Sequence, residues 1–148
     1  MKMKNQDYHT TLTVKTTAVA AFNGINNIPG WWSTNFEGCS EKTGDVFTVR
    51  FGETFITLKI VELIPYKKIG WHVIDCYKHW LKNKKEWQDT TMTWEIVEKN
   101  NATQISFTHF GLVPGIECFE ACEKAWKFYI EGSLFKLLTE AKGILELK

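Results

Sequence analysis

Arginine is almost absent from this chain: Arg50 is the single arginine among 18 basic residues. Because paired arginines are the usual forked receptors for phosphate and carboxylate groups, a site built on them is excluded. The net charge of +1 argues against a dedicated nucleic-acid binder or a binder of acidic lipid surfaces. The short basic run at 78–85 has no neighbouring basic face, so we interpret it as a solvated loop.

Long hydrophobic runs are also lacking. No stretch approaches the ~18 apolar residues that a membrane span needs, which predicts no stable membrane insertion. No apolar run follows the N-terminus, so the sequence predicts no signal peptide and a cytoplasmic location. In that compartment the four cysteines, at positions 39, 76, 118 and 122, are expected to stay reduced.

Catalytic and cofactor motifs are missing as well. The cysteines and histidines do not have the spacing of a zinc site, and no nucleophile elbow, phosphate loop or dinucleotide fingerprint occurs. We therefore predict no metal, no cofactor and no catalytic residue.

Aromatic residues are abundant, at 14% of the chain, with seven Trp and ten Phe. Side chains of this size must form a bulky core or line a cavity. The length of 148 residues and a hydrophobic share of 44% predict a single globular domain over 1–148.

Hydrophobic periodicity predicts an α+β fold. Alternating patterns separated by turn residues indicate strands at 8–15, 34–40, 45–51, 54–64, 68–75, 90–98 and 102–109. Two short helices are expected after the first strand, at 17–25 with a threonine cap and at 28–32 with a proline near its start. Spacings of three and four from 116 to 142 predict one long amphipathic helix, ended by Gly143 and with close packing or a bend at Gly132.

These elements predict a curved antiparallel sheet of about seven strands around a long C-terminal helix, with a cavity between the two. Sequential strands with short links favour a meander.

The pattern resembles the START-like, Bet v 1-like helix-grip superfamily (SRPBCC). Within it the chain is most similar to the family of the activator of heat-shock-protein-90 ATPase homologue, with polyketide cyclase-like relatives. The resemblance spans about 10–143 and is carried by AAF at 20–22 with WW at 31–32, VELIP at 61–65 leading to Trp71, MTWEI at 92–96, SFTHFGL at 106–112, and WKFYI at 126–130 with SL at 133–134 and LL at 137–138. The family's proline before the first helix is replaced here by two threonines. The superfamily includes lipid carriers, cyclases and co-chaperone regulators, so the resemblance implies a fold and not one function.

Strand alternation sorts the side chains into an inner and an outer face. The inner face is expected to carry Asp75 and His109 as polar groups, and the helix is expected to contribute Tyr129. The predicted apolar lining of the cavity is Trp31, Phe47, Phe51, Trp71, Val73, Met92, Trp94, Phe107, Trp126 and Ile130. Trp31 and Trp32 are consecutive, so we expect only one of them to point inward.

The favoured function is binding of a hydrophobic or aromatic small molecule, or a lipid, in this cavity. One alternative is a polyketide cyclase- or hydratase-like enzyme that uses Asp75 or His109 in the same cavity. Another is an interaction domain that regulates a chaperone ATPase, as the family resemblance implies. A homodimer is compatible with a domain of this size.

Overall fold

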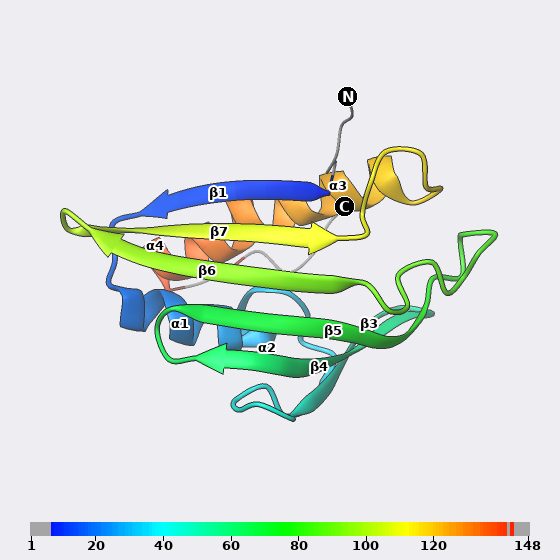
Figure 1. The fold of residues 1–148 in the computed structure, drawn as a ribbon, viewed down its shortest axis with the longest axis horizontal. Helices are drawn as coiled ribbons and strands as arrows, with labels where there is room; N and C mark the ends of the chain where they lie inside the picture. The colour runs from blue at the N-terminus through cyan, green and yellow to red at the C-terminus, as the bar shows by residue number, and fades with distance from the viewer. Residues whose placement is uncertain (1–6, 142, 144–148) are drawn as a thin grey trace.

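A computed structural model describes residues 7–141 and 143. A seven-stranded antiparallel sheet forms one layer, and the helices cover one face of it (Figure 1). The strand order is β1-β7-β6-β5-β4-β3-β2, so a meander from β2 to β7 ends beside β1. The strands are β1 (Tyr8–Val14), β2 (Phe36–Gly38), β3 (Val46–Phe51), β4 (Thr54–Ile64), β5 (Lys68–Tyr77), β6 (Thr91–Lys99) and β7 (Ala102–Phe110). The predicted fold class is confirmed, although β2 is shorter than the strand expected at 34–40.

Two short helices follow β1, as expected. Helix α1 (Ala18–Asn26) begins after Thr17, whose Oγ1 accepts a hydrogen bond of 3.0 Å from the backbone N–H of Ala20. Helix α2 (Ile28–Trp31) has Pro29 in its first turn, where a missing N–H costs nothing. They pack against the C-terminal helix and the inner face of the sheet.

The C-terminal helix is continuous but not uniformly α-helical. It consists of α3 (Phe119–Trp126), a π-helical segment η1 (Lys127–Leu134) and α4 (Phe135–Glu140). The wider π turn brings two adjacent pairs to the core side, since Tyr129, Ile130, Ser133 and Leu134 are all buried. The helix starts later than the predicted 116. Ala141, with a left-handed φ of 63°, ends it instead of Gly143; the predicted last residue, 142, lies outside the described residues.

A β-bulge in β5 changes the face on which Asp75 lies. Leu58 pairs with Val73 and Thr57 with Asp75, so Ile74 is the extra residue on the bulged strand. After the bulge Cys76 is fully buried, and Asp75 is a partly exposed residue of the outer face. The expectation that Asp75 lies on the inner face is therefore wrong, because strict alternation does not survive an inserted residue.

The core between sheet and helix is filled largely by indole and phenyl rings. Trp31 and Trp32 are both buried, at 0% and 3% exposure, so the expectation that only one points inward is wrong. The ring of Trp32 lies nearly parallel to Trp31 at 5.7 Å and to Trp71 at 5.8 Å. A second parallel pair joins Trp87 to Trp126 at 5.8 Å. Both indoles find room because the rings stack instead of diverging.

Candidate functional site

A pocket of about 620 Å³ lies at one end of the interface between the C-terminal helix and the sheet. We call it the indole pocket, because Trp32, Trp80, Trp87 and Trp126 all line it. Its walls come from the segment after α2, the β3–β4 hairpin, the loop between β5 and β6, and one face of α3 and η1. These segments are far apart in the sequence and meet only through the fold.

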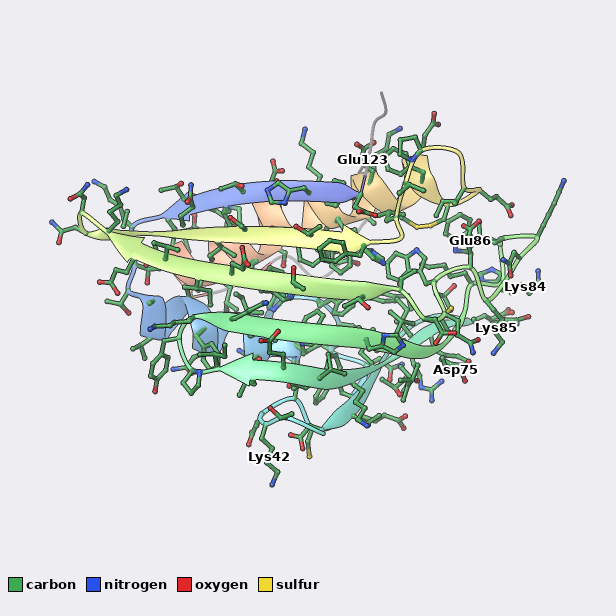
Figure 2. All side chains as sticks on the ribbon, in the orientation of Figure 1. Lys42, Asp75, Lys84, Lys85, Glu86 and Glu123 are labelled. Carbon is green, nitrogen blue, oxygen red and sulfur yellow. A yellow bond between two sulfur atoms is a disulfide. The ribbon has the colours of Figure 1, made fainter. Side chains whose placement is uncertain are left out.

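The loop between β5 and β6 is held against the start of the C-terminal helix. The Glu86 carboxylate accepts hydrogen bonds from the backbone N–H groups of Glu117 and Cys118, at 3.0 and 2.9 Å. The backbone N–H of Lys82 donates to the Glu117 carboxylate at 2.9 Å. Figure 2 shows Glu86 in this loop, beside Lys84 and Lys85. These contacts place the two tryptophans of the loop at the pocket.

Cys118 and Cys122 form a disulfide beside the pocket. They are one helical turn apart, with Cα atoms separated by 5.6 Å, which lies within the range that a disulfide can bridge. The expectation that these thiols are reduced is therefore not met in the structure. Cys39 and Cys76 are free.

The pocket wall carries positive charge and no carboxylate. No Asp or Glu is among the residues that line it, whereas Arg50 and Lys78 both line it. Arg50 is paired with Glu37 at 3.1 Å. Lys78 is 6% exposed, and its ammonium lies 4.1 Å from the centre of the Trp87 ring and 5.6 Å from that of Trp80. Burial lowers the pKa of Lys78 from 10.5 to about 8.

The predicted polar site residues separate in the structure. Tyr129 lines the pocket, and burial raises the pKa of its hydroxyl, which therefore stays a hydrogen-bond donor at neutral pH. His109 is fully buried beneath the pocket: Nδ1 accepts from the Trp126 indole at 3.1 Å, and Nε2 lies 2.9 Å from the Thr90 hydroxyl. Asp75 binds Lys85 at 2.7 Å on the outer face (Figure 2). The hydrogen bond from Lys85 lowers the pKa of the Asp75 carboxyl.

The predicted apolar lining separates in the same way. Phe51 and Trp126 line the indole pocket. The others form the packed core next to it, all at 0 or 1% exposure: Trp31, Phe47, Trp71, Val73, Met92, Trp94, Phe107 and Ile130. The open space therefore lies at one end of the interface and not along its middle.

Sequence reasoning missed several residues of the pocket. Trp80, Trp87 and Lys78 belong to a loop without periodicity, and the basic run that contains Lys78 and Trp80 was interpreted as solvated. The structure buries Lys78 and Trp87 instead. Two tryptophans within and beside a lysine-rich run were the available signal, because indoles are seldom left wholly in water.

No protein-family model and no curated protein matches the sequence. Solved structures do match in fold. The Aha1 dimer from Colwellia psychrerythraea aligns with a TM-score of 0.75 and 19% identity, over 93% of this chain and 98% of that one. DynU16, a protein of the dynemicin biosynthetic locus, aligns with a TM-score of 0.70 and 13% identity, over 95% of this chain and 49% of that one.

This chain has the helix-grip fold. CalU16 from Micromonospora echinospora shares it, with a TM-score of 0.61 and 9% identity over 88% of this chain and 73% of that one. The likenesses confirm, at the level of fold, the resemblance inferred from the sequence. Among the described residues, no helix is long and apolar enough to cross a membrane. In the same part of the chain, no three His, Cys, Asp or Glu side chains are grouped so that they could hold a metal ion.

Proposed function

We propose that this protein binds an aromatic small molecule in the indole pocket. The observation that carries the proposal is a volume of about 620 Å³ with four indoles in its wall. Small-molecule pockets in proteins have volumes of roughly 300–1,000 Å³, so this pocket is large enough for a drug-sized ligand. Flat aromatic rings stack favourably on or against indoles. A lipid chain fits the apolar wall less specifically than a planar ring.

The exposure of the four indoles supports the same occupant. Trp32, Trp87 and Trp126 are buried at 3, 4 and 2% and form a fixed wall, whereas Trp80 is 47% exposed. A ligand that covers Trp80 removes its apolar surface from water, which contributes about 25 cal/mol per Å². The Tyr129 hydroxyl, which makes no hydrogen bond to another described residue, can orient a polar group of the ligand.

The geometry favours binding over the cyclase-like alternative. An enzyme of that kind needs Asp75 or His109 in the cavity. Asp75, however, is ion-paired on the outer face, and both ring nitrogens of His109 are hydrogen-bonded beneath the pocket. The chaperone-regulating alternative needs a broad partner surface, whereas the feature found here is concave and sized for a small molecule.

A homodimer and a cytoplasmic location stay predictions. The Aha1 protein from Colwellia psychrerythraea forms a dimer. Light scattering on the purified chain measures its own oligomeric state directly.

Binding is tested with phenylnaphthylamine, a neutral aromatic probe, by quenching of tryptophan fluorescence. We expect saturable binding by the natural chain. Ala125→Trp, which fills the pocket from α3, should weaken it at least tenfold, since Ala125 lines the wall. Ala20→Trp, at an exposed position of α1, is the matched control and should bind as the natural chain does. Equal binding of the probe by both variants would refute the proposal.

A further inference from the structure

Lys78 occupies an unusual place for a lysine. Its backbone is fixed at the end of β5, because its N–H donates to Lys84 at 2.9 Å and its carbonyl accepts from Leu81 at 3.0 Å. Its side chain is 6% exposed and lies in the wall of the indole pocket. The ammonium group stands over the faces of Trp87 and Trp80, which both line the pocket as well. Among the described lysine and arginine side chains, the only one buried to this degree thus lies beside the cavity.

In the part of the chain that the structure describes, this ammonium group has no anionic partner. Among the described residues, no carboxylate lies within ion-pair distance of Lys78 and no side chain or carbonyl accepts a hydrogen bond from it. The neighbouring Lys84, by contrast, donates to the carbonyls of His79 and Leu81, at 3.0 and 2.7 Å. Taking a cation out of water is costly, and contacts with two indole faces offset only part of that cost. A bound anion would supply what is missing.

The rest of the pocket wall also favours an anionic ligand. Its wall includes two cations and no acid, and the other cation, Arg50, is already paired with Glu37. At pH 7 Lys78 is still mainly protonated, because burial lowers its pKa only to about 8. The pocket therefore offers one positive charge that has no ion-pair partner among the described residues and lies within an aromatic wall.

We propose that the ligand is an aromatic organic acid, with its ring against the indoles and its anionic group bound by the Lys78 ammonium. This inference rests on the proposed function and names the substrate class of the same pocket. Paired arginines are excluded by the sequence, but a single buried lysine acts as a point charge and is sufficient for one anionic group. The Tyr129 hydroxyl adds a second donor in the same wall.

Two probes that share an aromatic frame separate the charge from the ring. Anilinonaphthalene sulfonate carries one negative charge, and phenylnaphthylamine carries none. We expect the natural chain to bind the sulfonate at least about tenfold more tightly, since only the sulfonate can accept a charge-assisted hydrogen bond from Lys78. Lys78→Met, which keeps the length of the side chain without its charge, should remove this preference, measured as the ratio of the two affinities within the same variant.

The controls make the result specific. Lys42→Met removes a lysine that is exposed and lies well away from Lys84 and Lys85 in Figure 2, and it should keep the preference for the sulfonate. Lys78→Arg, which keeps a positive charge, should retain most of it and provides a second folded variant to compare. Thermal unfolding of each variant confirms that it is folded before binding is measured.

The outcomes distinguish the two proposals. If neither probe binds the natural chain, the proposed function fails, and the inference about the anion fails with it. If both probes bind the natural chain equally and Lys78→Met changes neither affinity, the pocket is a ligand site but its ligand is not recognised by charge, and only this inference is overturned. Loss of the preference in Lys78→Met but not in Lys42→Met supports it.

Discussion

The indole N–H of Trp126 donates a hydrogen bond to Nδ1 of His109 at 3.1 Å. Because an indole nitrogen can only donate, Nδ1 carries no proton, and the proton of the neutral ring lies on Nε2. Nε2–H therefore donates to the Thr90 hydroxyl at 2.9 Å, which in turn donates to the Trp87 carbonyl at 2.7 Å. The chain of bonds joins the C-terminal helix to β7 and to the loop that carries Trp87. It fixes two rings of the indole pocket from below.

The first prediction concerns acid stability. Burial, with a smaller contribution from the charge of Lys78, lowers the pKa of His109 from 6.5 to about 3. Between these values the unfolded chain binds a proton that the folded chain does not, so stability falls as pH decreases from about 6.5 toward 3. The loss from this residue should be about 2 kcal/mol between pH 7 and pH 5.

Urea unfolding at both pH values measures this loss in the natural chain and in His109→Gln, which has no titrating ring. The difference between the two pH values should be smaller by about 2 kcal/mol in the variant. Nitrogen chemical shifts of His109 in the natural chain give an independent measurement, with a neutral ring protonated on Nε2 down to pH 5. A ring that gains charge between pH 7 and pH 5 would contradict the prediction.

The second prediction concerns Thr90. Thr90→Val keeps the shape of the side chain but leaves the Nε2–H of His109 without its acceptor, whereas the Trp87 carbonyl keeps its bond of 3.0 Å from the backbone N–H of residue 90. Unsatisfied buried groups of this kind lower the free energy of unfolding by about 1–3 kcal/mol. Thr90→Ser keeps the hydroxyl and is the matched control, with a smaller loss measured by the same denaturation. Equal losses in both variants would show that the methyl group, and not the hydrogen-bond chain, stabilises this region.

Much of the fold could be predicted because periodicity survives wherever one face of an element is buried throughout. In β7 the alternation of Thr103, Ile105, Phe107 and His109 agrees with burial residue by residue. The strand predicted at 54–64 has the bounds of β4. Burial of one face of a strand requires apolar residues at alternate positions, and this alternation is visible in the sequence.

The site was harder to predict, because it depends on departures from regular periods. One inserted residue, Ile74, turns Asp75 to the outer face, and nothing in the composition of β5 marks the bulge. The π turn of η1 buries adjacent pairs that a period of 3.6 separates. Lys78 and Trp87 are buried by contacts between the loop and α3 that are distant in sequence. Local patterns carry no information on such contacts.

The third prediction compares two helical glycines. A Cβ added at Gly132 meets no atom of a neighbouring element within 4 Å, so the close packing expected there is absent. Gly132 lies instead in the π-helical segment η1. Gly132→Ala should therefore raise the free energy of unfolding by about 0.5–1 kcal/mol, the usual helical gain. A Cβ at Gly24 would lie 2.6 Å from a methyl group of Leu138, where α1 packs on α4.

Gly24→Ala forces the half-buried Leu138 side chain to turn aside, which offsets part of the helical gain. In thermal unfolding, Gly132→Ala should therefore raise the midpoint more than Gly24→Ala does. The reverse order would mean that the helix packs on α1 differently from the structure described.

The last prediction concerns the pH dependence of anion binding at Lys78. With a pKa of about 8, the free ammonium loses its proton as pH rises through that value, and a neutral amine attracts an anion far less. Nearby groups act in known directions: Cys76 and Glu86 favour the protonated lysine, and His109 stays neutral. Affinity for anilinonaphthalene sulfonate should therefore fall by at least about tenfold between pH 7 and pH 10.

Affinity for phenylnaphthylamine should stay constant, and Lys78→Arg should keep its sulfonate affinity across the same range, because a guanidinium is not deprotonated there. A sulfonate affinity that is flat in the natural chain, or that falls equally in Lys78→Arg, would place the anion away from Lys78.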